Sequence, residues 1–466
     1  MNIIHISAEC YPIAKVGGLA DVVGALPKYQ KELQASSSVI MPLYNNSFTQ
    51  TNKFEKIYEN YIALGHEYVN IQVLKLIDNK LGFELFCIHI PDLLFKDYVY
   101  SNNDTDRFLA FQIATLDWIL TLDKKPDIIH IHDHHTGLIP FMLTQSYKYE
   151  KLKDIPTVLT IHNAQYQGWF SHEKVSLIPP FNFENVGLLD WGDSINPLAA
   201  AIKCSWRVTT VSPSYMEELK LNANGLENLL ASESNKCIGI LNGIDSKVWN
   251  TETDNNLVKN YNISSSKSGK KANKKWLCQK FNLDENKPLF TFIGRLVGEK
   301  GSDLFPEIFT KALKENNISI LLLGSGDKEV EERLNYIPKE NFNFYIGYNE
   351  KLAHIIYAGA DFLLMPSRVE PCGLNQMYSL KYGTVPIVNT IGGLKDTIID
   401  INSKDGYGIL HNGVTIKEVT DAITRATKFY SEKEKFTKNL KTIMKIDNSW
   451  NNSAQEYVNL YKTLKQ

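Results

Sequence analysis

Short, continuous apolar runs that lead into glycine-containing loops constrain this chain more than any other feature. The first run covers residues 2–8, a loop with Gly17 and Gly18 follows, and apolar residues then recur at helical spacing as far as residue 33. Continuous apolar runs indicate strands buried on both faces, which is typical of parallel sheets covered by helices. The sequence therefore predicts an α/β protein that begins with a strand, a glycine loop and a helix.

Similar runs recur in both halves of the chain and predict two sheets. A single hydrophobic core stops growing at roughly 250–300 residues, and this chain has 466. We also expect helices over residues 415–430, with Thr415 as N-cap, and over residues 453–464. The further predicted strands are residues 127–132, 157–162 and 207–212 in the first half, and 289–293, 318–323, 343–346, 362–365 and 385–388 in the second.

The stretch ISSSKSGKKANKK, at residues 263–275, offers almost nothing apolar to bury and divides the two series of strands. We therefore predict an N-terminal domain over residues 1–250, an exposed linker over 251–275 and a C-terminal domain over 276–440. Residues 441–466 are expected to form a C-terminal helix, with the first domain as one surface against which it could pack.

Charge and cysteine usage limit the partners and the compartment. Fifty Lys and Arg against 52 Asp and Glu leave a formal charge of −2, so no global positive field would attract nucleic acid or an anionic membrane. The six cysteines are widely spaced, and no basic leader or run of about 18 apolar residues is present. We expect a cytoplasmic protein that holds any anionic ligand with a local group of cations.

Two loops that follow predicted strands combine glycine with positive charge. Gly17 and Gly18 let the backbone approach a ligand closely at a helix N-terminus, and Lys15 adds a full charge. Arg295 and Lys300 lie in the second loop, GRLVGEKG, where they are suited to grip a diphosphate. The alternatives are a tight strand-to-helix turn with a surface lysine, and two solvated loop cations.

Residues 370–376, EPCGLNQ, follow the strand predicted to end at Met365. Glu370 is interpreted either as a carboxylate that caps a helix or as one that binds sugar hydroxyls. Cys372 is interpreted as a small residue in a tight turn, because no partner base is evident. Further along, Gly392 and Gly393 repeat the glycine pair before a helix and suggest a second anion contact.

The run His130 to His135 (HIHDHH) raises the possibility of a metal site, because alternate residues of a strand share a face. No other cluster plainly completes a coordination sphere, so we predict no metal. The acidic pattern at Asp104 and Asp106 is likewise interpreted as a solvated loop.

Seven segments carry a joint resemblance to a known family. They are residues 15–27 (KVGGLADVVGALP), 132–140 (HDHHTGLIP), 160–168 (TIHNAQYQG), 209–215 (TTVSPSY), 242–245 (NGID), 294–301 (GRLVGEKG) and 370–388 (EPCGLNQMYSLKYGTVPIV). Together they resemble bacterial glycogen synthases and plant starch synthases. His134 and Asn389 depart from the family pattern, which has Trp and a basic residue at these places.

The resemblance implies a GT-B fold, in which two Rossmann-like domains face a central cleft. Residues 1–250 would form the acceptor side, and residues 276–440 would bind the nucleotide sugar. It also implies transfer of glucose from ADP-glucose to the nonreducing end of an α-1,4-glucan with retention, and no cofactor or metal. The competing interpretations are a retaining GT-B enzyme that uses UDP-glucose or a small acceptor, a metal-dependent hydrolase, and a glucan-binding protein without activity.

The resemblance also implies roles for individual residues, which are assigned through the motifs that they match. The resemblance implies catalytic roles for His162, which would contact the transferred glucose, for Glu370 at its outer hydroxyls, and for Asp133 near the acceptor. Arg295 and Lys300 would hold the diphosphate. The remaining residues implied in donor binding are Lys15, Gly17, Gly18, Asn242, Cys372, Gly373, Leu374, Gly392 and Gly393.

Overall fold

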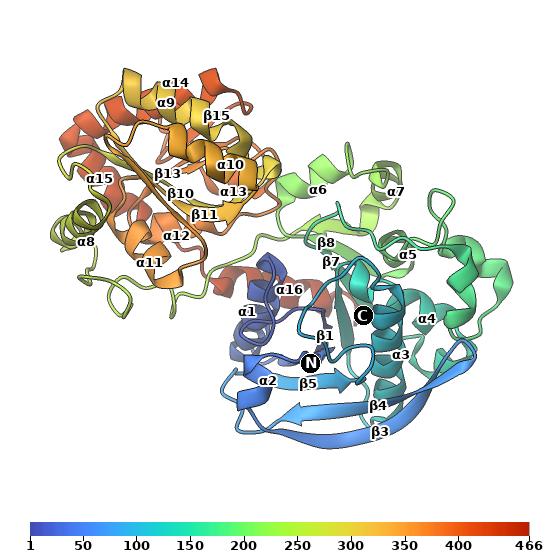
Figure 1. Ribbon diagram of the computed structural model, residues 1–466. Helices are drawn as coiled ribbons and strands as arrows, with labels where there is room; N and C mark the ends of the chain where they lie inside the picture. Colours follow the sequence, from blue (N-terminus) through green and yellow to red (C-terminus); the bar gives the residue numbers. More distant parts are fainter. Residues whose placement is uncertain (466) are drawn as a thin grey trace. The chain divides into compact units, whose positions relative to one another are not determined.

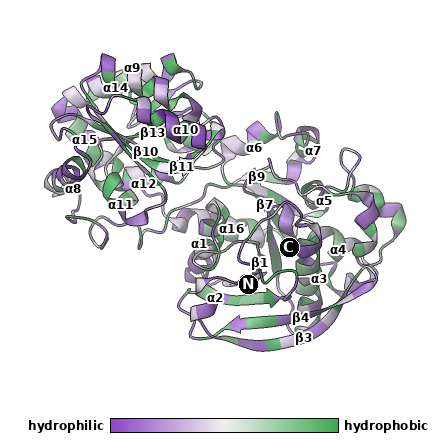
Figure 2. Ribbon diagram, in the orientation of Figure 1, coloured by the Kyte–Doolittle hydropathy of each residue, from purple (hydrophilic) through white to green (hydrophobic). Residues whose placement is uncertain are grey.

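The computed structural model describes residues 1–465, which divide into two compact units (Figure 1). Unit 1 comprises Met1–Gly243 together with the chain from Trp450 onward, and unit 2 comprises Ile244–Ser449. Each unit has one sheet and its own hydrophobic core. Figure 2 shows apolar residues gathered along the sheets and hydrophilic residues on the outer turns of the helices.

The sheet of unit 1 has nine strands in the order β3-β4-β5-β2-β1-β6-β7-β8-β9. The pairs β3–β4 and β4–β5 are antiparallel, and the other neighbours are parallel. The strands are β1 (Asn2–Ile6), β2 (Ser36–Pro42), β3 (Phe54–Leu64), β4 (Glu67–Leu76), β5 (Glu84–His89), β6 (Ile128–His132), β7 (Thr157–Ile161), β8 (Arg207–Thr210) and β9 (Cys237–Gly239).

The final helix of the chain, α16, packs on unit 1. Trp450, Tyr457 and Tyr461 of α16 share a buried cluster with Val22 and Leu26 of α1. Short 3-10 turns supplement the helices, including η1 (His134–Thr136) after β6. The helices of unit 1 are α1 (Gly18–Glu32), α2 (Ser47–Thr51), α3 (Thr105–Thr121), α4 (Ile139–Gln145), α5 (Pro197–Cys204), α6 (Pro213–Leu219), α7 (Glu227–Ser232) and α16 (Trp450–Lys462).

The sheet of unit 2 is parallel, in the order β12-β11-β10-β13-β14-β15. The side chain of Thr415 accepts a hydrogen bond from the backbone of Glu418, which confirms it as the N-cap of α14. The elements are β10 (Leu289–Leu296), β11 (Ser319–Gly326), β12 (Phe342–Ile346), β13 (Phe362–Met365), β14 (Val385–Asn389), β15 (Ile409–His411), α8 (Ser266–Phe281), α9 (Phe305–Glu315), α10 (Lys328–Arg333), α11 (Glu350–Gly359), α12 (Asn375–Lys381), α13 (Gly392–Thr397), α14 (Ile416–Ser431) and α15 (Lys433–Ile443).

All nine predicted strands are present, and six further strands were not predicted. The hairpin of β3 and β4 was not predicted because most of its residues are exposed or half-buried, so its sequence has no clear apolar pattern. The strands β9 and β15 have three residues each, too few for a periodicity to emerge.

The prediction of an exposed linker over residues 251–275 is wrong. Helix α8 begins at Ser266, and Lys270 and Lys274 are buried. The ammonium group of Lys270 donates to the carbonyls of Ala358 and Tyr382, each at 3.1 Å. The prediction took a lysine-rich stretch to be exposed to solvent. The long aliphatic part of a lysine side chain can nevertheless be buried when its ammonium group donates to protein oxygen atoms.

Burial lowers the pKa of Lys270 to about 7. Lys274 makes a buried ion pair of 2.7 Å with Asp361, which also accepts a hydrogen bond from the backbone of Leu289. Residues 251–275 therefore belong to the fold of unit 2. Within residues 1–465, no helix is long and apolar enough to cross a bilayer.

Replacing Lys274 with Met would leave the carboxylate of Asp361 buried without its ionic partner. We expect the free energy of unfolding of unit 2 to fall by about 3–5 kcal/mol, measured by urea denaturation with hydrogen exchange of α8 peptides. The matched control is Lys417→Met, which breaks the exposed pair of Lys417 and Asp421 and should cost at most about 0.5 kcal/mol. Equal losses in the two variants would contradict a buried role for α8.

Candidate functional site

The strand order marks one place in each sheet where a ligand should bind. In unit 1 the chain leaves β1 toward β2 on one side and returns to β6 on the other. In unit 2, β10 has β11 on one side and β13 on the other. Open parallel sheets bind ligands at the carboxyl ends of the strands where the order reverses in this way.

The glycine loop of unit 1 follows β1 and is held by Glu9. The buried carboxylate of Glu9 accepts hydrogen bonds from the backbone of Val16 at 2.6 Å and Gly17 at 3.0 Å, and from the hydroxyl of Tyr100 at 2.5 Å. A Cβ atom on Gly17 or Gly18 would meet no protein atom within 4 Å. Internal packing therefore does not require these glycines, and close approach of a ligand explains them better.

Lys15 lies beside this loop and makes an exposed ion pair of 2.7 Å with Asp21. Exposed pairs contribute little to stability, so an anionic ligand can compete for the ammonium group at small cost.

Asp133 follows β6 and has a positive φ of 55°. Its carboxylate accepts a hydrogen bond of 2.7 Å from the backbone N–H of His162, which follows β7. Burial raises the pKa of Asp133 to about 7. Asp133 therefore positions the backbone that carries His162, a contact that the sequence pattern did not predict.

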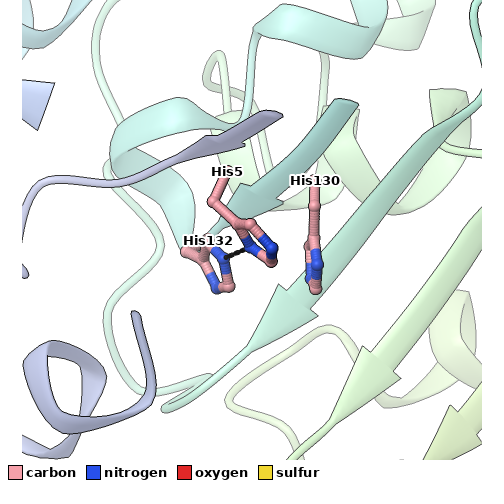
Figure 3. A group of neighbouring side chains, drawn as sticks. All are labelled: His5, His130 and His132. Atoms are coloured by element: carbon pink, nitrogen blue, oxygen red, sulfur yellow. Dashed lines mark hydrogen bonds between the residues drawn. The ribbon is translucent and has the colours of Figure 1, made fainter. Parts of the chain in front are cut away.

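Three buried histidines gather at the same switch point (Figure 3). His5 of β1 pairs in register with His130 of β6, and one nitrogen from each of His5, His130 and His132 lies within 4.8 Å of the others. The metal group considered from the sequence contained Asp133, whose carboxylate instead bonds to the backbone of His162. His5 was missed because its neighbours in the cluster lie more than 120 residues away in the chain.

Asn242 carries an unpartnered polar atom. Its side chain is buried, and Oδ1 makes no hydrogen bond within residues 1–465. Buried polar atoms are rarely left unpaired, so a ligand hydroxyl is a fitting partner for this oxygen.

In unit 2, the loops after β10 and β13 bring together Lys300 and Glu370, and Arg295 lies near the end of β10 itself. Lys300 and Glu370 form an ion pair of 2.6 Å, and the hydroxyl of Ser367 donates to the same carboxylate oxygen at 2.8 Å. The guanidinium group of Arg295 is exposed and makes no hydrogen bond or ion pair with the rest of residues 1–465. Glu370 does not cap α12, whose N-cap position is Leu374, so the capping interpretation is wrong.

Arg368 ties these two loops together. Its guanidinium group makes a bidentate pair with Asp303, at 2.6 and 2.9 Å, and its backbone N–H donates to the carbonyl of Glu299 at 2.7 Å. Asn389, at the end of β14, holds the loop after β13 from the other side of that strand, because its amide donates to the carbonyl of Ser367 at 2.8 Å. Neither residue was predicted to support the site.

The glycine pair at 392 and 393 is explained by packing. A Cβ on Gly392, where φ is +44°, would lie 2.1 Å from the carbonyl oxygen of Glu370, and one on Gly393 would lie 2.1 Å from that of Cys372. The turn also contains Gly373, with φ of +72°, and Cys372 is buried as predicted. These glycines allow α13 to approach the 370–374 turn closely.

The acidic pattern at residues 104–106 is engaged in local ion pairs. Asp104 pairs with Arg107 at 2.5 Å, and Asp106 pairs with Lys174 at 2.7 Å. Asp104 also accepts hydrogen bonds from Ser101. These carboxylates stabilise the start of α3 and its surroundings.

Comparison with known proteins agrees with this geometry. The model of the starch synthase catalytic domain matches residues 2–232, and that of glycosyl transferases group 1 matches residues 274–442. A glycogen synthase of Flavobacterium johnsoniae is 51% identical over 472 residues, with both chains covered completely. A glycogen synthase of Acholeplasma laidlawii is 35% identical, covering 100% of this chain and 99% of its own.

The chain belongs to the glycogen and starch synthase family. Among solved structures, the catalytic domain of starch synthase IV from Arabidopsis thaliana, bound to ADP and acarbose, superposes with a TM-score of 0.89 at 30% identity and 99% coverage of both chains. The predicted GT-B fold is therefore confirmed, and the protein is a hexosyltransferase.

The raised pKa of Asp133 predicts a pH dependence of stability. Between pH 3.8, its ordinary pKa, and about 7, the folded protein holds a proton that the unfolded chain has released. Stability from this group is thus present at low pH and is lost as pH rises toward 7. Asp133→Asn, which tolerates the positive φ, should remove this loss, worth up to about 4 kcal/mol.

The measurement is the melting temperature of wild type and variant at pH 5 and pH 8. We expect the wild type to lose more stability than the variant between these values. A difference between the two proteins that stays constant across the range would contradict a raised pKa at Asp133.

Proposed function

We propose that this protein transfers glucose from ADP-glucose to the nonreducing end of an α-1,4-glucan, with retention at the anomeric carbon and release of ADP. The observation that carries the proposal is the ion pair of Lys300 and Glu370 at the switch point of unit 2, where Arg295 lies near the end of β10. Family membership supports it, as does the starch synthase relative bound to ADP and acarbose.

The cations of the site match the charge that develops in the reaction. Cleavage of the bond between glucose and phosphate leaves negative charge on the diphosphate, and groups that stabilise it more strongly in the transition state accelerate the reaction. Arg295 presents an unpaired planar fork for phosphate oxygens. The ammonium group of Lys300 has three N–H bonds and donates to Glu370, so it retains donors for a phosphate.

In unit 1, Lys15 and the open backbone of Gly17 and Gly18 are proposed to bind phosphate oxygens of the donor. The three cations offset roughly two negative charges, so the proposed reaction requires no metal. Addition of a chelator should leave the rate unchanged.

The proposal assigns sugar contacts to named residues of each unit. His162 and Asn242 bind hydroxyls of the transferred glucose, as does Glu370, while Asp133 holds the backbone of His162. The backbone of the turn at Cys372, Gly373 and Leu374 contacts the donor in this proposal. Gly392 and Gly393 serve it indirectly, because their lack of a Cβ lets α13 support that turn.

The glucan is proposed to bind near exposed aromatic side chains that follow His162. Tyr166 and Trp169 are 56% and 57% exposed and offer flat faces on which sugar rings can stack. We further propose a cytoplasmic location, where the donor nucleotide sugar would be available.

A matrix of donors and acceptors tests the proposal. ADP-glucose and UDP-glucose are each supplied with glycogen or with a small sugar, and release of ADP or UDP is measured. We expect rapid ADP release with glycogen only. Preference for UDP-glucose or for the small sugar would instead support another retaining GT-B transferase.

Lys300→Ala should lower kcat by about 10² to 10³-fold, because it removes a donor that stabilises the leaving diphosphate and leaves Glu370 as an unpaired negative charge. The measurement is ADP release at saturating donor and glycogen. Lys417→Ala, an exposed lysine of the same unit, serves as the control and should retain the wild-type rate. Wild-type kcat in Lys300→Ala would sink its proposed role.

The ion pair makes a second test possible. Glu370→Gln should also reduce kcat with the fold intact. The double variant Lys300→Ala/Glu370→Gln should lose less transition-state stabilisation than the sum of the losses in the two single variants. The reason is that removing Lys300 leaves no unpaired carboxylate when residue 370 is Gln. Strict additivity would show that the pair does not act as a unit.

A further inference from the structure

Two of the three buried histidines of unit 1, His5 and His132, lie on a continuous hydrogen-bond chain that ends at His162. Its links, in order, are Gln30 Oε1 to His5 Nε2 at 2.9 Å, His5 Nδ1 to His132 Nε2 at 3.1 Å, and His132 Nδ1 to His162 Nε2 at 3.0 Å. Figure 3 shows the central bond between His5 and His132. Each of these bonds needs one N–H and one lone pair, so the proton position at one end determines the proton position at the other.

A second chain fixes the orientation of the Gln30 amide. It starts at the carbonyl of Leu159, which can only accept, and receives the hydroxyl of Thr209 at 3.1 Å. The hydroxyl of Thr160 must then donate to Thr209, at 2.6 Å, so its oxygen accepts from Nε2 of His130, at 2.6 Å.

The same direction of hydrogen-bond donation continues through His130 to Tyr461 of α16. Nδ1 of His130 is then the lone-pair nitrogen and accepts the hydroxyl proton of Tyr461 at 2.6 Å. With that proton used, the oxygen of Tyr461 accepts from Nε2 of Gln30 at 3.3 Å. The amide oxygen of Gln30 therefore faces His5, and it also accepts from Ser37 at 2.6 Å.

The rings on both chains are neutral. Burial lowers the pKa of His5 to about 4 and that of His162 to about 3, and it lowers the pKa of His130 and His132 well below the ordinary value. No carboxylate is hydrogen-bonded to any of these four rings. Each imidazole thus carries one proton, and the two chains are consistent only in the direction described.

We propose that Gln30, His5 and His132 are positioning residues that hold His162 as its Nε2–H tautomer and leave Nδ1 as a hydrogen-bond acceptor. Nδ1 of His162 makes no hydrogen bond within residues 1–465 and is not fully enclosed, so a ligand can reach it. This inference deepens the proposed function, on which its substrate part rests, and assigns the acceptor that meets a hydroxyl donated by the transferred sugar. Tyr461 and His130 act one step further back, because they orient Gln30.

The arrangement also explains the histidine cluster without a metal. All six ring nitrogens of His5, His130 and His132 have hydrogen-bond partners in the protein. A cation among them would have to break several of these bonds.

The direct test is the tautomer of His162 in the full-length protein. With histidine labelled by ¹⁵N, long-range proton–nitrogen NMR should show an unprotonated Nδ1, with the signal assigned through its loss in His162→Gln. Tyr461→Phe removes the hydroxyl that orients Gln30 and should introduce the Nδ1–H tautomer. Tyr149→Phe is the matched control, because it removes a buried hydroxyl of unit 1 that bonds to Asp117, off the chain.

Kinetics give the second readout. Tyr461→Phe and Gln30→Met should lower kcat about tenfold or more, as expected when a partner that orients a functional histidine is lost. Gln30→Glu keeps an acceptor facing His5 and should restore much of the rate. Tyr149→Phe should retain wild-type kcat.

Three results would overturn the inference. They are an Nδ1–H tautomer in the wild type, a tautomer and kcat unaffected by Tyr461→Phe, and a stoichiometric metal in the purified protein that disappears in His5→Gln. The NMR readout does not require a substrate. Absence of ADP release in the donor and acceptor experiment would therefore reject the proposed function. The tautomer of His162 would still be decided by NMR alone.

Discussion

Parallel strands bring all their carboxyl ends to one edge of a sheet, and the placement of every functional side chain in this protein depends on that constraint. In unit 1 it brings the loop after β1 beside the loop after β6, so Glu9, His132 and Asp133 arise near one place from distant parts of the chain. In unit 2 it does the same for Lys300 and Glu370, which lie 70 residues apart. The chemistry of the site is thus a consequence of strand order.

Burial on both faces imposes a second requirement, which the polar residues of the sheet of unit 1 must meet. A histidine within a covered parallel sheet cannot be hydrated, so each ring nitrogen needs a partner from the protein. His5 and His132 meet this need by bonding to each other, to Gln30 and to His162, and His130 meets it by bonding to Thr160 and Tyr461. A network of this kind, fully paired, stabilises one arrangement of protons over the alternatives.

Sequence reasoning predicted the strands that are continuous and apolar, together with the loops after β1 and β10. It failed where burial depends on partners far along the chain. Lys270 and Lys274 resembled a solvated linker, because the sequence does not reveal the carbonyls and the carboxylate of Asp361 that receive them. His5 could not be joined to His130 before the register of β1 and β6 was known. The ion pair of Lys300 and Glu370 was likewise invisible, although both residues were identified individually.

The membership of α16 in unit 1 bears on how the protein is made. Unit 2 is one continuous stretch of chain, whereas unit 1 lacks Trp450, Tyr457 and Tyr461 until α16 has been synthesised. On the ribosome, unit 2 can therefore reach its native state first. The apolar surface of α1 remains uncovered until α16 packs on it. Termination of synthesis before α16 would release a chain in which the apolar residues of α1 are exposed, the sort of surface that chaperones and proteases recognise.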